Sequence, residues 1–163
     1  MSVKTKIQRL AISSLGLLSA TTIASPFLLK VEPASANCQV SPTALEVTKL
    51  TNQVRARYRL RPLRSSCRLY KVAQNHTVNM VRMKKMSHTG SDGSDVSTRV
   101  KRVGYQYSAI AENVAQGQKN PSQVVNAWMK SPGHRKNILS PKYTEIGVGY
   151  SNNYWTQVFG NSR

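Results

Sequence analysis

Residues 126–139 (NAWMKSPGHRKNIL) constrain this chain more than any other stretch, because a helix end, a bend and a polar side chain follow one another there. Apolar residues with helical spacing come first, and Pro132 then disfavours helical geometry at Ser131. Gly133 can adopt backbone angles that other residues avoid. The pattern predicts a helix that ends near Ser131, a Pro-Gly corner, and His134 pointing into a cleft from the start of the next turn.

The first 36 residues have the pattern of a secretory signal peptide. A basic start is followed by the mostly apolar residues 10–29 and by Ala34-Ser35-Ala36, a small-x-small cleavage pattern. We therefore expect residues 1–36 to be removed and residues 37–163 to form one secreted domain. A periplasmic location and an uncleaved membrane anchor are the alternatives, since residues 10–29 are about as long as a membrane-spanning helix.

The chain is strongly basic, with 24 Lys and Arg against 6 Asp and Glu. Such a charge favours anionic partners, namely lipid head groups, acidic polysaccharide or nucleic acid. Between residues 55 and 68 six arginines recur, but their spacing does not form one helical face. We therefore interpret this segment as a solvated loop around Pro62, not as a polyanion groove, and expect no specific nucleic-acid partner.

Two cysteines, Cys38 and Cys67, lie in the part predicted to be exported. An oxidising compartment favours one disulfide between them, and two unpaired thiols are the alternative. Their number and spacing do not suggest a zinc finger.

Two helices are predicted in the first half of the domain. Pro42 suits the first turn of a helix whose start we assign to a capping box of Thr43 and Glu46. A second helix is expected at residues 67–83; His76 lies within its apolar stripe, so we interpret it as a hydrogen-bonded core residue. The apolar stripe of the first helix consists of Val47, Leu50, Val54 and Tyr58.

Shorter elements are predicted in the second half. We expect a short helix at 94–103, a brief strand or extended turn at 110–115, a helix after the cap Asn120, and a hairpin of strands 146–150 and 154–159. Helices come first and strands mostly last. This order favours an α+β fold, with an antiparallel sheet covered by helices, over a repeated βαβ arrangement.

Three polar side chains are candidates for a functional site. His88 and His134 lie at predicted junctions between helix and loop, and Glu112 is flanked by the apolar Ile110 and Val114. A buried carboxylate needs a partner. Two imidazoles and a carboxylate can hold Zn²⁺ or perform acid–base chemistry.

Several motifs in a fixed order resemble the CAP superfamily (cysteine-rich secretory proteins, antigen 5 and pathogenesis-related proteins; also called the SCP domain) in its bacterial form. The resemblance covers residues 45–160. Its motifs are Asn52-x-x-Arg55, Pro62-Leu63, Met86-Ser87-His88-Thr89, Glu112-Asn113-Val114-Ala115, residues 128–139, Ile146-Gly147-Val148-Gly149 and residues 154–160.

The resemblance implies a three-layer α-β-α sandwich around a three-stranded antiparallel sheet, and a cavity with two histidines and two acids. His88, His134 and Glu112 match three of these positions. Ser131 stands at the fourth, where it could bind a ligand or merely cap a helix. Glu145 could replace the missing acid or be a surface residue at a strand edge.

Two functions follow as expectations from the resemblance and from these residues. The first is a secreted binding module for a lipid, a sterol or an anionic cell-envelope ligand, with His88 and His134 holding Zn²⁺ weakly. The second is a zinc-dependent or His/Glu-assisted hydrolase of the peptidase kind. Enzymatic activity is left open, because no nucleophile with a base and an orienting partner is evident in the sequence.

Overall fold

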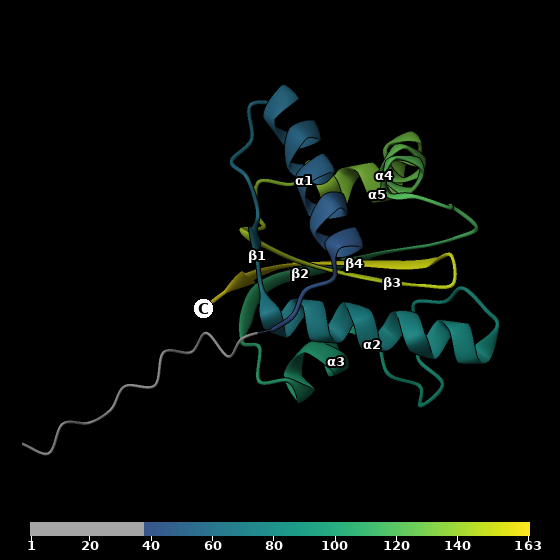
Figure 1. Cartoon of the computed structure of the whole chain (residues 1–163). Coiled ribbons are helices and arrows are strands. Elements are labelled where there is room, and N and C mark those ends of the chain that lie inside the picture. The colour runs from purple at the N-terminus through teal and green to yellow at the C-terminus, as the bar shows by residue number, and fades with distance from the viewer. Residues whose placement is uncertain (1–37) are drawn as a thin grey trace, which may run out of the picture. The chain divides into compact units, whose positions relative to one another are not determined.

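The helices lie in two layers, one on each face of a central sheet (Figure 1). The computed structural model describes residues 38–163, so the predicted signal peptide lies outside the described residues. The predicted α+β sandwich of three layers is confirmed. One layer contains α1 (Pro42–Arg57), α4 (Pro121–Lys130) and α5 (Pro132–Ile138); the other contains α2 (Cys67–Met83) and α3 (Val96–Arg102).

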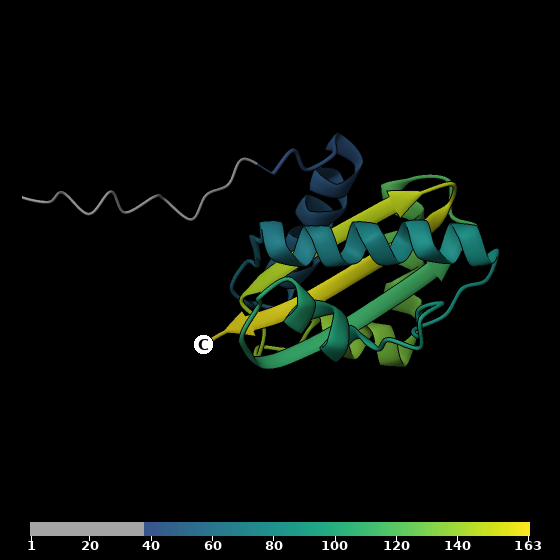
Figure 2. The same ribbon diagram turned by 90° about the horizontal axis from the view of Figure 1, so that it is seen from below.

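The sheet has the strand order β1-β3-β4-β2, and Figure 2 shows α2 lying along its face. The three strands expected from the resemblance are the antiparallel β2, β3 and β4. A fourth strand of two residues, β1, pairs in parallel with β3 and was not predicted. The bounds are β1 (Arg64–Ser65), β2 (Tyr107–Gln116), β3 (Glu145–Ser151) and β4 (Tyr154–Ser162).

The predicted hairpin is formed by β3 and β4. Its turn consists of Asn152 and Asn153, whose φ values of 47° and 62° both lie in the left-handed region. Two-residue turns with this backbone match the twist of the strands they join, and asparagine adopts it more readily than most residues. The turn fixes the register in which Val148 lies opposite Gln157.

Helix starts agree with the sequence in part. Asn120 caps α4 as predicted, because its Oδ1 accepts a hydrogen bond of 2.9 Å from the Gln123 N–H. The capping box of Thr43 and Glu46 is wrong, since Ser41 is the cap of α1 and its Oγ accepts from Ala44 at 3.2 Å.

Two further details of the helices differ from expectation. Tyr58 is 48 % exposed because α1 ends one residue before it, so its place in the apolar stripe is wrong. Gly133 has helical geometry inside α5, and the corner before His134 is formed instead by Ser131, whose ψ of 120° is extended.

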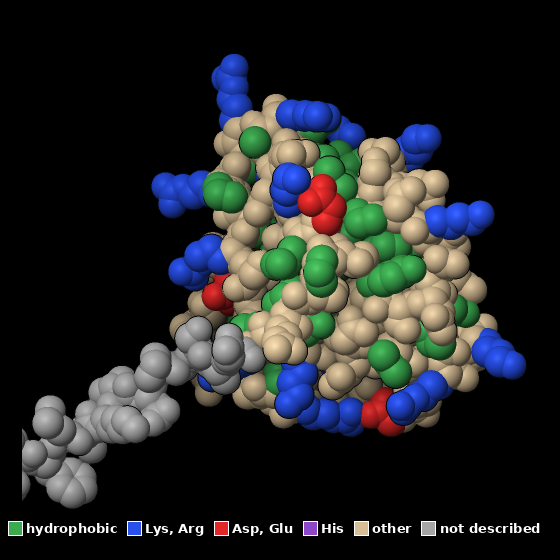
Figure 3. Space-filling model, viewed as in Figure 1, with side chains coloured by type: hydrophobic (Ala, Val, Ile, Leu, Met, Phe, Trp, Pro, Cys, Tyr) green, Lys and Arg blue, Asp and Glu red, His purple; other side chains and the backbone are tan. Residues whose placement is uncertain are grey.

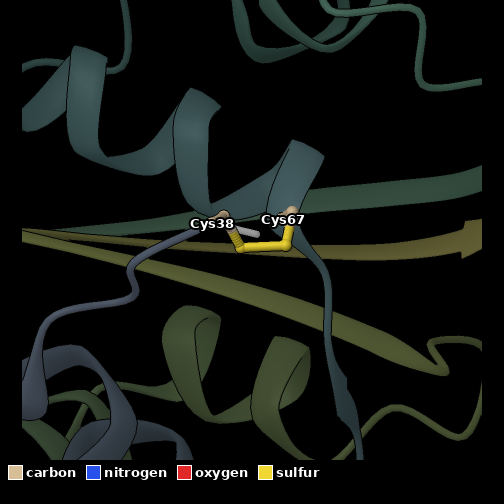
Figure 4. Close-up of a disulfide and its surroundings, with 2 residues drawn as sticks. All are labelled: Cys38 and Cys67. Carbon is tan, nitrogen blue, oxygen red and sulfur yellow. A yellow bond between two sulfur atoms is a disulfide. The ribbon is translucent and has the colours of Figure 1, made fainter. Parts of the chain in front are cut away.

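The disulfide between Cys38 and Cys67 is confirmed (Figure 4). It joins the segment before α1 to the first residue of α2, with the two Cα atoms 5.7 Å apart.

The largest hydrophobic cluster lies between the sheet and the layer of α1 and α4, and it contains Trp128, Trp155 and Phe159.

The arginines of the arginine-rich segment are exposed apart from Arg55, which is 1 % exposed. Its Nη1 donates to the carbonyls of Ile138 and Ser140 at 2.7 and 2.8 Å, and its Nε donates to Arg61 O at 3.0 Å. The solvated interpretation is therefore wrong for this residue. Elsewhere on the face shown in Figure 3, Lys and Arg side chains project outward at separate places.

Within residues 38–163, none of the helices combines the length and the apolar content that a membrane span requires.

Candidate functional site

Glu112 lies on β2 and is the buried centre of the site. Its side chain is 2 % exposed, and its Oε1 is 2.9 Å from Nδ1 of His88, which follows α2 in a loop. A carboxylate oxygen accepts, so the His88 ring donates from Nδ1. In the neutral ring Nε2 then has no proton and can accept a hydrogen bond or bind a metal. The His88 side chain is 60 % exposed, so it is accessible to a ligand.

Arg99 of α3 occupies the second oxygen of Glu112. Its Nη2 donates to Oε2 at 2.7 Å and to the His88 carbonyl at 3.1 Å, and its Nη1 donates to Ser94 O at 2.6 Å. This guanidinium therefore holds the carboxylate and also the backbone of the loop that carries His88. Charge-assisted hydrogen bonds of this kind fix geometry more firmly than neutral ones.

His76 of α2 packs against the same carboxylate. It is buried, its Nε2 donates to Ser87 O at 2.8 Å, and the same atom lies 3.9 Å from Glu112 Oε1. The interpretation as a hydrogen-bonded core residue agrees with this contact. Burial is the main cause of the lowered pKa of His76.

His134 stands in the first turn of α5, and Asn113 and Asn137 hold that helix against β2. Asn113 Nδ2 donates to the His134 carbonyl at 3.2 Å, and Asn137 Nδ2 donates to Asn113 Oδ1 at 2.9 Å. The Asn137 amide also reaches the backbone carbonyl of Glu112 at 3.4 Å. The helix carrying His134 is thus fixed to the strand segment that carries Glu112.

The pKa values of the two predicted site histidines shift in opposite directions. The hydrogen bond to Glu112 raises the pKa of His88. Burial lowers the pKa of His134, and the charge on His88 lowers it further. Between these two pKa values His88 carries its second ring proton and His134 does not.

Comparison with known proteins identifies the fold and its family. A sequence model of the CAP family, the cysteine-rich secretory protein family, matches residues 48–159. The chain belongs to the CAP family.

Bacterial relatives agree with this assignment. YkwD of Bacillus subtilis is 41 % identical over 127 residues, which cover 77 % of this chain and 49 % of that protein. An extracellular protein of Bacillus anthracis that contains an SCP domain has a TM-score of 0.72 and 28 % identity over 74 % of this chain and 40 % of its own. The chain thus spans half or less of the length of these two CAP relatives.

A more distant structure supports the CAP fold alone. An outer surface protein of Borrelia burgdorferi has a TM-score of 0.66 and 22 % identity, covering 72 % of this chain and 90 % of its own.

Ser131 and Glu145 take different places in this CAP domain. Ser131 is half-buried at the junction of α4 and α5, and its side chain makes no capping hydrogen bond. Glu145 lies on β3, where it accepts from Tyr105 Oη at 2.6 Å and lies 3.4 Å from Arg64 Nη2. Both carboxylate oxygens of Glu145 thus have partners, and neither partner belongs to the predicted set of His88, Glu112, Ser131 and His134.

Sequence reasoning missed Arg99 as part of the CAP site. A signal was present, because Val96, Arg99, Val100 and Val103 share one helical face, and a charged residue on an apolar face needs a buried partner. That partner could not be named from the sequence, because α3 and β2 meet only in the folded domain.

The donor set limits which metal ligands this CAP domain can provide. His88 and Arg99 use the two oxygens of Glu112, so that carboxylate is an outer partner and not a free ligand. Among the described residues, no group of three or more His, Cys, Asp or Glu side chains is placed to hold a metal ion. The imidazole nitrogens of His88 and His134 are of the donor type that Zn²⁺ prefers, with water as the usual further ligand.

Proposed function

We propose that this CAP domain works outside the cell as a binding module, with its ligand site at His88, Glu112 and His134. The hydrogen bond between His88 Nδ1 and Glu112 Oε1, which leaves Nε2 free on an exposed ring, is the observation that carries the proposal. The predicted signal peptide and the extracellular location of the Bacillus anthracis relative support this proposal.

A divalent metal such as Zn²⁺ fits this arrangement as a weakly bound cofactor. His88 and His134 would hold it, and Glu112 would orient the His88 ring, as carboxylates commonly do for metal-binding histidines. When bound, the metal supplies an open coordination position for an oxygen of a ligand. Because the pKa of His88 is raised, a proton competes with the metal, so affinity should increase as the pH rises through that pKa.

Calorimetric titration with zinc at neutral pH tests the metal part. We expect wild-type protein to bind zinc, and His88→Ala and His134→Ala each to weaken binding by about tenfold or more. Lys136→Ala, an exposed change on the same helix as His134, is the matched control and should bind as the wild type does. Absence of zinc binding by the wild type, or unchanged binding after both histidine substitutions, would refute the metal site.

The ligand that the proposal favours is a lipid, a sterol or another component of the cell envelope. Vesicles with and without anionic lipid or sterol provide the probe, with His88→Ala/His134→Ala as the comparison. If the site binds the ligand, the double variant should bind the vesicles less at every salt concentration. Binding that disappears at physiological salt in both proteins would instead be due to the basic surface.

Hydrolysis is less well supported than binding. Over residues 38–163, no Ser, Thr or Cys side chain is hydrogen-bonded to the ring of His88 or His134, and Ser87 Oγ instead accepts from the Thr89 N–H at 2.9 Å. A nucleophile is ordinarily hydrogen-bonded to its base. Turnover of a peptide or ester library that His88→Ala abolishes would favour a hydrolase over the binding module.

A further inference from the structure

A second surface lies away from the histidine site and shares no residue with it. It is a groove of about 760 Å³ between the α1–β1 loop, the α5–β3 loop and the end of β4. Arg59, Arg61 and Arg64 line one side of it. The segment interpreted from the sequence as a solvated loop therefore forms one wall of this groove. We call this surface the arginine groove.

Most of the positive charge in the arginine groove is not neutralised by a carboxylate. Arg59 and Arg61 are exposed, and no carboxylate in the described part of the chain forms an ion pair with either. Arg64 lies 3.4 Å from Glu145, but its side chain is 76 % exposed, and exposed pairs of this kind contribute little. The groove therefore presents guanidinium groups to an anionic partner.

The backbone of Arg59 determines which substitution removes its side chain cleanly. Arg59 follows the end of α1 with a φ of 56°; its N–H donates to Ala56 O at 2.9 Å and the Leu60 N–H donates to Arg55 O at 3.1 Å. This is the Schellman arrangement, in which glycine is the usual residue at the left-handed position. A side chain in this conformation costs conformational energy, as it also does at Lys84, so a glycine at Arg59 removes the guanidinium without straining the backbone.

We propose that the arginine groove binds an acidic polysaccharide. Guanidinium groups pair with sugar carboxylates through two parallel hydrogen bonds. Pro62 and Tyr143 line the groove with apolar surface on which sugar rings can pack. Ser162 offers a hydroxyl to the sugar, and the Thr144 hydroxyl, which donates to Asn161, can still accept from it.

Two other anionic partners fit the groove less well. A flat membrane cannot enter a concavity of this kind. Bases of a single-stranded nucleic acid would require several stacking side chains, and Tyr143 is the one aromatic residue among those that line the groove.

Titration with a short oligogalacturonate tests the proposal, with its methyl-esterified, uncharged form as the ligand control. We expect wild-type protein to bind the charged oligomer, and Arg59→Gly and Arg61→Ala each to weaken binding by about three- to tenfold. Lys84→Gly is the matched protein control, because Lys84 is also an exposed basic residue with a left-handed φ of 50°, but it lies at the end of α2 and outside the groove. It should bind like the wild type.

Thermal unfolding distinguishes lost contacts from lost structure. Glycine relieves the left-handed strain but makes the unfolded chain more flexible, so we expect Arg59→Gly and Lys84→Gly to melt at the wild-type temperature or about 1–3 °C above it. Weaker binding by Arg59→Gly then cannot result from unfolding.

The proposal would be overturned if the wild type did not bind the oligogalacturonate, if the esterified oligomer bound equally well, or if Lys84→Gly weakened binding as much as Arg59→Gly. It would also be overturned if oligothymidylate or phosphatidylglycerol vesicles bound more tightly than the oligogalacturonate and this binding depended on Arg59. None of these results bears on zinc at His88 and His134, so the two proposals fail separately.

Discussion

At the scale of single residues, the buried carboxylate of Glu112 governs both the charge and the position of His88. Replacing it by Glu112→Gln removes the negative charge that raises the pKa of His88 and leaves the buried Arg99 without its anionic partner. We expect the pKa of His88, followed by NMR titration, to fall towards its ordinary value. The free energy of unfolding should fall by about 2–4 kcal/mol, mainly because of Arg99.

The effect of this substitution on stability should depend on pH. Because the pKa of His88 is raised in the folded state, its bond to Glu112 contributes stability that is complete below the unfolded pKa of about 6.5 and is lost as the pH rises through the folded value. The loss of unfolding free energy caused by Glu112→Gln should therefore be larger at about pH 5.5 than at about pH 8. Glu46→Gln on the exposed face of α1 is the control, and an unchanged pKa of His88 in Glu112→Gln would contradict the assigned role.

At the scale of elements, the packing of α2 on β3 depends on glycines that leave no room for a side chain. A Cβ at Gly147 would overlap the backbone of Leu69 and Tyr70. We expect Gly147→Ala to reduce the free energy of unfolding by about 2–4 kcal/mol in denaturant titrations, since neither backbone can move without disturbing the core.

Gly133→Ala is the matched control for this change. Gly133 is helical and nothing lies within 4 Å of the Cβ it would gain, so alanine there should stabilise the protein by about 0.5–1 kcal/mol. Equal stability of the two variants would show that the contact between α2 and β3 is not as close as described.

The sequence predicts those elements whose signals are local. Helix α2 and the β3–β4 hairpin are found where expected, because apolar periodicity and the two asparagines of the turn specify them directly. Strand β1 could not be predicted, because its two residues are a strand only beside β3. The position of Arg99 on an apolar helical face predicts a buried partner, but the partners of Arg55 and Arg99 are distant in sequence and are known only from the fold.

At the scale of the whole molecule, the disulfide joins the two helical layers through Cys38 and Cys67. It closes a loop with a sequence separation of 29 that contains α1 and β1. In the chain-entropy model such a loop contributes about 3–4 kcal/mol, so reduction should lower the melting temperature markedly. The variant Cys38→Ser/Cys67→Ser should melt at this lower temperature and be insensitive to reductant; no effect of reduction on the wild type would contradict the prediction.

The candidate histidine site is made of residues from separate elements of the domain. The family resemblance selects His88, Glu112 and His134, but these residues come from a loop, a strand and a helix. Arg99 holds the loop of His88 and the carboxylate of Glu112, and Asn113 holds the first turn of α5 against β2.

Arg55 connects the arginine groove to the helix that carries His134. Its guanidinium binds the Arg61 carbonyl within the α1–β1 loop and the Ile138 carbonyl at the end of α5, the helix that carries His134. A lysine has one ammonium and cannot reproduce this planar set of bonds. Exchange of this single residue would therefore loosen the α1–β1 loop and helix α5 together, although almost none of its side chain is open to solvent.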